Sequence, residues 1–333
     1  MKAAFKRGEA VTLRDAELRS LNPDEIRLRV AACGICGTDL HLHPGEEERE
    51  AGFGHEIAGT LLEVGSGVTD LSVGQKVVLE SASACGRCAN CRNCRQELCT
   101  DIKSFFDMDA MGFAEEMIAP AISAIPCEDL PPDIACLSEP LGVAIDMVRL
   151  AEIDLTSNVL LMGAGPIGLM ALALVKRKGA RRTFFVAYQH QAARVRLVEQ
   201  FGADAVIDPH ETPLDRYDFG CSIDRILVTS PPPTLNGAFA VAAKGAIIAF
   251  IGIAYGDGAF CRFEANDFHF KKLQLRASFA SPALYTPLAL QYLREGVVNG
   301  AALISHRFPL TVIEEAMQVA RDKRSAVKVV VMP

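Results

Sequence analysis

The sequence predicts an α/β protein in which a mostly β first half precedes a doubly wound parallel sheet. Two observations predict this fold class: the pattern of apolar residues changes near residue 142, and a glycine-rich turn, GAGPIG, follows the first strand of the second half. A chain of 333 residues also exceeds one typical domain, so two domains with separate hydrophobic cores are expected.

Before residue 142, apolar and polar residues alternate in short segments. Residues 25–30, EIRLRV, are typical, and turns such as EVGSGV at 63–68 separate the segments. Alternation of this kind indicates strands with one buried face. The first half is therefore predicted to be mostly strand.

After residue 142, apolar strands alternate with helices. Six segments share a short apolar run that is typical of buried strands: 158–162, 183–188, 205–208, 223–229, 246–253 and 273–278. Strands connected by helical crossovers form a parallel sheet. The pattern becomes mixed again from about residue 283, so the expected divisions of the chain are 1–142, 143–282 and 283–333.

The GAGPIG turn has the residues that a dinucleotide-binding (Rossmann) domain requires. Gly163 permits a tight turn, Gly165 lets backbone amides approach a pyrophosphate, and Gly168 allows the helix to pack closely on the strand. Pro166 and Ile167 open the helix, whose N-terminus faces the negative charge. Together with the strand before the turn, these residues predict a dinucleotide site.

The choice between NAD and NADP stays open. An acidic residue that binds the adenosine ribose is expected about twenty residues after the turn, but Gln189 stands there. A glutamine does not repel the 2′-phosphate of NADP, and Arg194 alone does not decide the matter. Discrimination against NADP is therefore expected to be weak.

Five cysteines lie within fifteen residues, 85–99. Four of them have the spacing C-x2-C-x2-C-x7-C, which lets a tight turn and a returning strand surround one zinc ion: Cys85, Cys88, Cys91 and Cys99. Four thiolates close the coordination sphere, so this zinc would be structural. The alternatives are a chance cluster of buried cysteines and a zinc ribbon that binds nucleic acid through Arg87, Arg92 and Arg95.

A second set of zinc-ligand types is spread along the first half. Cys36 and His55 lie within a short span, and Glu139 lies at the predicted domain junction. Three protein ligands would leave the fourth coordination position open to a substrate, as catalytic zinc requires. Taken one at a time, each residue also fits a purely structural role.

The composition limits the partners and the compartment. A formal net charge of −7 argues against nucleic acid and anionic membranes. The N-terminal residues have no apolar core followed by a cleavage site, and the longest uncharged apolar stretch, 159–175, contains the GAGPIG turn. We therefore expect a cytoplasmic protein without a transmembrane helix and with small-molecule partners.

The motifs also carry a family resemblance. GICGTDLH, GHEIAG, the four-cysteine segment, SEPLGVA, GAGPIG and ISHRFPL occur in the order seen in the zinc-containing medium-chain alcohol and polyol dehydrogenases, over nearly the whole chain. The SEP context is most similar to the sorbitol, threonine and butanediol dehydrogenase branch. The resemblance implies a mostly β, GroES-like catalytic domain made from both chain ends, with the Rossmann domain inserted between them.

The resemblance also implies roles for individual residues of the catalytic domain. Cys36 and His55 would bind a catalytic zinc ion, and Glu56 and Glu139 are both candidates for the carboxylate ligand. Asp39 would hold the imidazole of His55 in its ligating orientation. Which glutamate binds in the resting state is left open.

The implied reaction is the oxidation of a secondary alcohol, with a polyol or sugar alcohol as the expected substrate. Zinc acts as a Lewis acid that favours loss of the hydroxyl proton, and NAD or NADP accepts the hydride. Thr38 and His41 resemble the family's proton relay, whereas His43 matches no motif and is expected in a solvated loop. The alternatives are a catalytically weak binding protein and a threonine-type dehydrogenase. A homo-oligomer, either dimer or tetramer, is also expected.

Four features depart from the family pattern. Cys94 stands where a glycine is common, so it is the expected spare thiol of the cysteine segment. The segment before His55 is short and carries the acidic run GEEERE at 45–50, and the chain between 208 and 222 is abbreviated. TSPPPT at 229–234 replaces a glycine-bearing turn, which makes contacts on the nicotinamide side less secure.

Overall fold

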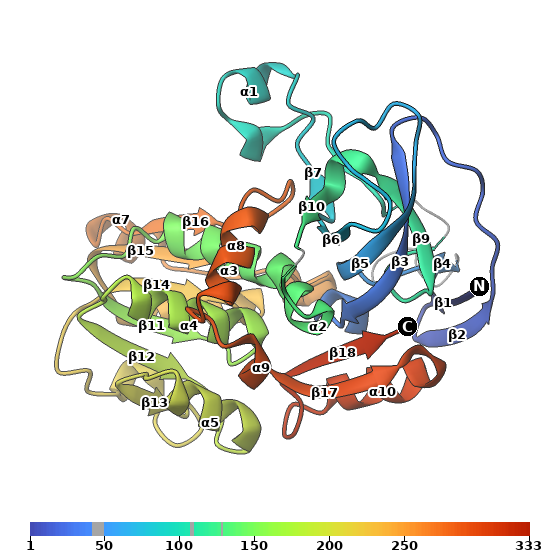
Figure 1. Cartoon of the computed structure of the whole chain (residues 1–333). Helices are drawn as coiled ribbons and strands as arrows, with labels where there is room; N and C mark the ends of the chain where they lie inside the picture. The colour runs from blue at the N-terminus through green and yellow to red at the C-terminus, as the bar shows by residue number, and fades with distance from the viewer. Residues whose placement is uncertain (42–49, 107–109, 128) are drawn as a thin grey trace. The chain divides into compact units, whose positions relative to one another are not determined.

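The structure is a computed structural model that describes residues 1–41, 50–106, 110–127 and 129–333 (Figure 1). His43 and all but the last residue of the acidic run 45–50 lie outside the described residues. The chain forms two compact units. The first unit comprises Met1–Gly142, Ala280–Asp322 and Lys328–Pro333, and the second comprises Val143–Phe279 and Lys323–Val327.

A parallel sheet of six strands forms the centre of the second unit, in the order β13-β12-β11-β14-β15-β16. Its strands are β11 (Asn158–Met162), β12 (Arg182–Val186), β13 (Ala205–Ile207), β14 (Ile223–Val228), β15 (Ala242–Phe250) and β16 (Gln274–Ala277). The chain starts in the middle of the sheet, moves to one edge and then returns to build the other half. This order confirms the predicted doubly wound sheet.

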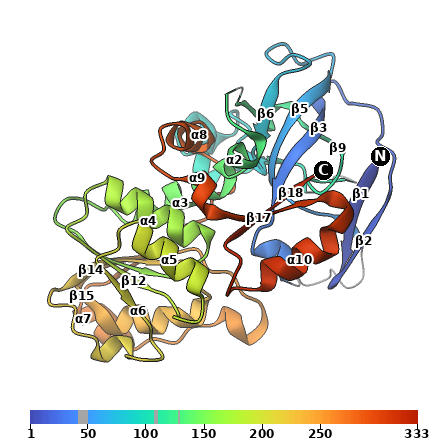
Figure 2. The same cartoon turned by 60° about the horizontal axis from the view of Figure 1, so that its bottom comes forward.

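Helices cover both faces of this sheet. Helices α4 (Pro166–Arg177) and α5 (Ala192–Gln200) lie on one face, and α6 (Leu235–Val241) and α7 (Ala265–Phe270) lie on the other (Figure 2). Right-handed crossovers require this division, because the two halves of the sheet are built in opposite directions.

The hydrophobic core under α6 explains why these strands are continuous apolar runs. Leu160, Ile226 and Ile248 come from three neighbouring strands and are fully buried. Leu235 and Phe239 of α6 belong to the same cluster. Strands that are buried on both faces have no solvent-facing positions for polar residues.

The first unit is mostly strand, as predicted. Its largest sheet has the order β10-β6-β5-β3-β18-β17, with β9 paired to β3, and smaller sheets have the orders β2-β1-β4 and β7-β8. The strands are β1 (Lys2–Arg7), β2 (Ala10–Asp15), β3 (Glu25–Gly34), β4 (Ala51–Gly52), β5 (Glu56–Val64), β6 (Lys76–Leu79), β7 (Ala82–Ser83), β8 (Lys103–Ser104), β9 (Glu116–Pro120), β10 (Ala124–Pro126), β17 (Ile304–Pro309) and β18 (Lys328–Met332). Helices in or entering this unit are α1 (Ala89–Arg92), α2 (Pro132–Ala135), α3 (Ser138–Leu150), α8 (Thr286–Arg294), α9 (Gly300–Leu303) and α10 (Ile313–Arg321).

The end of the chain completes the largest sheet. Strand β18 pairs antiparallel with β3, where Val331 lies opposite Cys33 and Val330 opposite Gly34. It pairs parallel with β17 on its other side. The C-terminal strand therefore lies beside the segment that leads from β3 to Cys36.

A short segment near the C-terminus, Lys323–Val327, belongs to the second unit. The backbone N–H of Ala193 donates to the carbonyl oxygen of Arg324 (3.3 Å), and Nε of Arg194 donates to that of Ala326 (3.0 Å). Arg194 therefore anchors this segment to the start of α5. None of the helices in the described ranges is long and apolar enough to span a bilayer.

Candidate functional site

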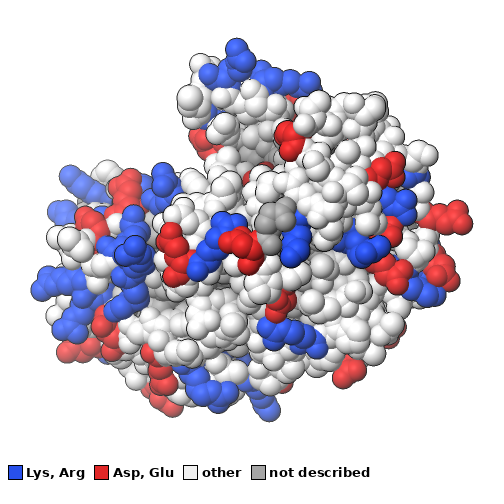
Figure 3. Space-filling view, viewed as in Figure 1, with Lys and Arg blue, Asp and Glu red and all other residues white. Residues whose placement is uncertain are grey.

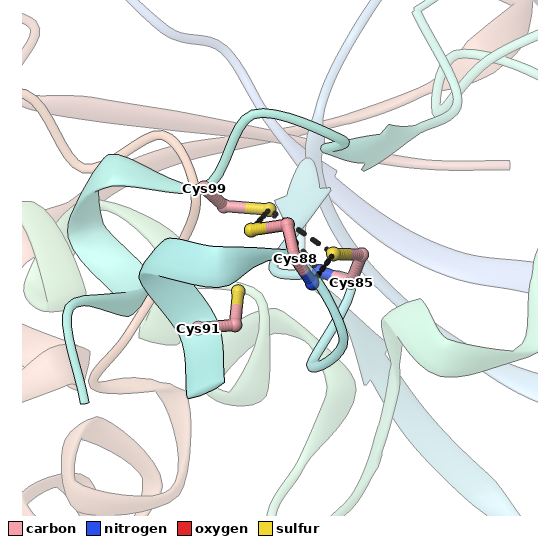
Figure 4. Close-up of side chains that lie close together, drawn as sticks. All are labelled: Cys85, Cys88, Cys91 and Cys99. Carbon is pink, nitrogen blue, oxygen red and sulfur yellow. Dashed lines mark hydrogen bonds between the residues drawn. The ribbon is translucent and has the colours of Figure 1, made fainter. Parts of the chain in front are cut away.

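Four thiols of the first unit point toward one another beside α1 (Figure 4). The ligand atoms of Cys85, Cys88, Cys91 and Cys99 lie within 4.8 Å of one another. Sγ of Cys99 lies 3.6 Å from Sγ of Cys85 and 3.9 Å from Sγ of Cys88. Two sulfurs bound at about 2.3 Å to one tetrahedral zinc ion lie about 3.8 Å apart, so this geometry fits zinc.

Backbone N–H groups favour the thiolate form of Cys85 and Cys88. The N–H of Cys85 donates to Sγ of Cys99, and the N–H of Cys88 donates to Sγ of Cys85, both at 3.3 Å. Backbone hydrogen bonds from Cys91 and Thr100 lower the pKa of Cys88 to about 5. Burial raises the pKa of Cys91 to about 12, and a bound metal would supply the positive charge that its thiolate lacks.

Cys94, the fifth cysteine of the segment, is not part of this group. It is exposed, and its φ of 57° lies in the left-handed region. Glycine adopts this conformation at no steric cost, whereas other residues are strained. The glycine that the family commonly has at this position therefore has a conformational reason.

A second group of metal-ligand atoms lies elsewhere in the first unit. The ligand atoms of Cys36, His55 and Glu56 lie within 4.8 Å of one another. Strands β3 and β5 are neighbours, with Gly34 opposite Glu56, and this pairing brings Cys36 beside His55. Burial by itself lowers the pKa of His55, but Cys36 and Asp39 raise it well above its usual value. The group thus favours a cation, which a bound metal would provide.

Asp39 is buried beside the ring of His55. Its Oδ1 lies 3.6 Å from Nδ1 of His55, and its Oδ2 accepts a hydrogen bond of 2.8 Å from the N–H of Cys36. A carboxylate that faces Nδ1 fixes the ring and leaves Nε2 for a metal ion.

A buried ion pair adjoins this group. The side chains of Lys328 and Glu56 are 2% and 1% exposed and contact one another, and Nζ of Lys328 also donates to the carbonyl oxygen of Ile35 (2.9 Å). A Cβ atom at Gly34 would clash with the carboxylate of Glu56. Sequence analysis missed Lys328, because no local pattern distinguishes it and its partner lies in a distant part of the chain.

Glu139 lies outside the close group. It occupies the first turn of α3 and is half-buried. Burial raises the pKa of Glu139 to about 7, with His55 opposing this rise and Glu56 adding to it. The structure therefore brings Glu56 next to Cys36 and His55, and Glu139 interacts electrostatically with His55 and Glu56.

Of the two residues that resemble a proton relay, Thr38 begins a 3-10 helix, Thr38–Leu40, that follows Cys36 after one residue. Thr38 is half-buried, and His41, the residue after the helix, is exposed. The turn thus leads from the metal-ligand group to the surface of its unit.

Phe106 is a second residue that sequence analysis missed. Its ring centroid lies 5.7 Å from that of His55, and its side chain is 49% exposed. The preceding residue, Phe105, is fully buried. The sequence shows two successive phenylalanines after the cysteine segment. No spacing rule tells which of them is buried in the core and which lies beside His55.

The glycines of the second unit fit the predicted pyrophosphate site. Gly163 has a φ of 115°, and a Cβ atom at Gly168 would clash with the carbonyl oxygen of Gly163. No atom lies within 4 Å of the position that a Cβ at Gly165 would occupy, so that side of the turn is open. Thr229, from the unusual TSPPPT segment, donates from Oγ1 to the carbonyl oxygen of Gly163 (3.0 Å).

The loop after β12 presents amide and imidazole groups where a carboxylate was expected. Gln189 is exposed, and its N–H donates to Oδ2 of Asp208 (2.7 Å). Asp208 is buried and also accepts from the N–H of His210 (2.9 Å). The ring of Tyr188 lies 5.5 Å from that of His190 and 4.6 Å from that of His210.

Two of the three arginines of the cysteine segment, Arg87 and Arg95, have acidic neighbours. Arg87 pairs with Asp101 (2.9 Å), and Arg95 lies 3.9 Å from Glu97. On the face shown in Figure 3, basic and acidic residues are interspersed. These pairs offset the positive charge on which the nucleic-acid alternative depends.

Comparison with known proteins decides the family. Residues 22–129 match the alcohol dehydrogenase GroES-like domain, and residues 166–293 match the family described as zinc-binding dehydrogenase. The chain is 32% identical to L-threonine 3-dehydrogenase of Thermococcus kodakarensis, an alignment that covers 93% of this chain and 91% of that protein. The chain belongs to the zinc-containing medium-chain alcohol and polyol dehydrogenase family.

Further relatives agree with this membership. The dehydrogenase is 30% identical to L-idonate 5-dehydrogenase of Vitis vinifera, with 94% of this chain and 89% of that protein covered. The crystal structure of a zinc-binding dehydrogenase from Sinorhizobium meliloti bound to NADP has a TM-score of 0.87 at 27% identity and covers 100% of this chain and 99% of that one. The protein is therefore a zinc-dependent enzyme that transfers hydride between an alcohol and a nicotinamide cofactor.

Elemental analysis tests the four-cysteine site. We predict two zinc ions per chain, because the two ligand groups are separate. Cys88→Ser should lose one of them and much of the protein's thermal stability. Cys94→Gly should keep both and gain up to about 1 kcal/mol in the free energy of unfolding, because it removes left-handed strain. One zinc ion in the unmodified, metal-replete protein would refute this prediction.

Alanine substitutions at Gly165 and Gly168 separate cofactor binding from stability. Gly165→Ala should leave Tm nearly unchanged, since its methyl group meets open space, but should weaken NAD and NADP binding by about tenfold or more. Gly168→Ala should lower Tm instead, because its methyl group meets backbone. Thermal melts and cofactor fluorescence titrations separate these effects, and normal cofactor binding by a folded Gly165→Ala enzyme would contradict the assignment.

Proposed function

We propose that this dehydrogenase oxidises a secondary alcohol that carries a second hydroxyl group on the neighbouring carbon, as in a polyol or sugar alcohol. The observation that carries the proposal is the donor set, in which Glu56 and Glu139 accompany a single thiol, Cys36. Carboxylate oxygens make a harder, more oxygen-rich site, which suits chelation of two neighbouring hydroxyl groups. The names of the relatives, which include sorbitol and L-idonate dehydrogenases, point to the same class.

In this proposal Cys36, His55 and Glu56 would hold the catalytic zinc ion at rest. Support comes from the close approach of their ligand atoms and from Lys328, which fixes the carboxylate of Glu56. Glu139, which interacts electrostatically with His55 and Glu56, would contribute to binding of the substrate hydroxyl groups. Zinc bound here would supply a Lewis acid that lowers the pKa of a hydroxyl group.

The other residues of the site have positional roles. Asp39 keeps the ring of His55 in its ligating orientation. Thr38 accepts the hydroxyl proton, and the exposed His41 passes it to solvent. Phe106 forms an apolar wall beside His55 that excludes water from the carbon that loses hydride.

In the second unit, the backbone at Gly165 binds the cofactor pyrophosphate, and Gln189 faces the adenosine ribose. Both NAD and NADP are accepted, because Gln189 brings no negative charge. Asp208 does not replace the missing carboxylate, since backbone N–H groups of Gln189 and His210 already bind it.

We also propose a homo-oligomer in the cytoplasm. Strand β16 is one edge of its sheet, the exposed Leu275 lies on this strand, and the exposed Phe279 follows it by two residues. A second copy would cover this open edge and the apolar surface. All the cysteines are free thiols, which is typical of a reducing compartment.

A substrate panel tests the substrate class. Sugar alcohols and vicinal diols should give a higher kcat/KM than monohydric alcohols of similar size, and Glu139→Ala should narrow that difference. Phe106→Ala is the matched variant, because it removes an apolar group beside His55. It should lower kcat/KM for all alcohols and leave the difference between diols and monohydric alcohols unchanged. L-Threonine belongs in the panel, because several relatives are L-threonine 3-dehydrogenases. Fastest turnover of threonine or of simple alcohols would contradict the polyol proposal.

Gln189→Asp tests the ribose assignment. The new carboxylate accepts bonds from the ribose hydroxyls and repels the 2′-phosphate, so the ratio of kcat/KM for NAD to that for NADP should rise by roughly tenfold or more. Gln189→Asn is the neutral control and should leave the ratio near its original value. An unchanged ratio in Gln189→Asp would show that this residue does not face the ribose.

A further inference from the structure

We propose that Lys6 and Arg321 are positioning residues, which hold the turn between Cys36 and His41 so that the proton can pass from the substrate to solvent. This inference rests on the proposed function, because it assumes that Thr38 and His41 carry the proton. It concerns two residues from opposite ends of the chain that no motif identifies.

Both cations bind the last carbonyl groups of the turn. Nζ of Lys6, on β1, donates to the carbonyl oxygen of His41 (2.7 Å). Nη1 of Arg321, the last residue of α10, donates to the carbonyl oxygen of Leu40 (2.7 Å). Two successive carbonyls that a 3-10 helix leaves without helical partners are thus bound from outside.

The turn depends on these outside contacts because its own hydrogen bonds are long. The N–H groups of Asp39 and Leu40 donate over 3.2 Å, and that of His41 donates over 3.3 Å. Hydrogen bonds from cations are roughly twice as strong as bonds between neutral groups. The start of the turn is fixed separately, since Asp39 accepts from the N–H of Cys36 (2.8 Å). Lys6 and Arg321 therefore hold the other end of the turn, which carries His41.

Burial of the Lys6 ammonium group has an energetic cost. The Lys6 side chain is 6% exposed, and removing an ammonium group from water costs several kcal/mol before any partner compensates. The bond of Lys6 to the residue that we propose as the outer member of the relay gives this lysine a positional role as well as a structural one.

Each cation fixes a different peptide group of the turn that positions Thr38 and His41. The carbonyl of Leu40 fixes the path of the chain after Asp39, and the carbonyl of His41 fixes the peptide that orients the imidazole. If either bond is lost, the distance between Thr38 and His41 varies, and proton transfer slows. Metal binding should not change, because Cys36 and Asp39 are held by other contacts.

The test compares Lys6→Met, Lys6→Arg and Arg321→Met in the zinc-loaded enzyme with its best alcohol substrate. The control is Arg27→Met, which removes an arginine bond to Glu116 (2.8 Å) between β3 and β9 of the same unit. The measurements are kcat, KM, the solvent deuterium isotope effect on kcat, zinc content and Tm. Hydrogen exchange of a peptide covering residues 36–41 reports on the turn without any substrate.

We expect kcat to fall by about tenfold in Lys6→Met and Arg321→Met, since a positioned acid or base contributes 10²- to 10⁴-fold and misalignment loses part of this. The solvent isotope effect should rise and exchange of the turn should quicken, while KM and zinc content stay within about twofold of their original values. Lys6→Arg, which keeps a cation at this position, should retain most of the kcat of the unmodified enzyme. Arg27→Met should change Tm alone.

An unchanged isotope effect, or a loss of kcat that merely follows Tm as in the control, would overturn the inference. If Lys6→Met does not fold, Arg321→Met provides the same comparison. An unmodified enzyme that oxidises no alcohol would contradict the proposed function instead, and hydrogen exchange would still decide whether the two cations hold the turn.

Discussion

The buried ion pair between Lys328 and Glu56 is the interaction on which the metal-ligand group depends. Lys328 begins the C-terminal strand β18, and Glu56 begins β5, so the pair forms only when the chain end packs beside β3. Removing one partner of such a pair leaves an unpaired buried charge and costs about 3–5 kcal/mol. Gly34 is required at the contact, because any side chain would occupy the place of the carboxylate. The fold and the site are therefore determined by the same few contacts.

The charge balance around His55 follows from this pair. Cys36, Asp39 and Glu139 raise the pKa of His55, and the carboxylate of Glu56 lies in the same group. The single ammonium group of Lys328, which pairs with Glu56, does not balance all of these acidic groups. A divalent cation restores neutrality in a dry environment, where unpaired charges are costly. The same reasoning applies to the four-cysteine group, in which backbone N–H groups support the thiolates but supply no full positive charge.

Sequence reasoning succeeded where the information is local. The doubly wound parallel sheet follows from alternating apolar strands and helices, and the open position at Gly165 follows from a motif of six residues. The four cysteines are close in sequence, so their spacing was sufficient to bring them together. Lys328 and Phe106 were not found, because their importance comes from contacts with residues far away in the chain. Sequence spacing also could not show that Glu56, and not Glu139, joins Cys36 and His55 within 4.8 Å.

A double-mutant cycle on the buried pair tests the central claim most directly. The free energy of unfolding is measured for the unmodified protein, Lys328→Met, Glu56→Gln and the double variant. If the pair organises the site, each single change is strongly destabilising, and the double change costs less than the sum by at least about 1 kcal/mol. Additivity within about 0.5 kcal/mol would show that the two side chains act independently, and it would contradict this account of how the site is built.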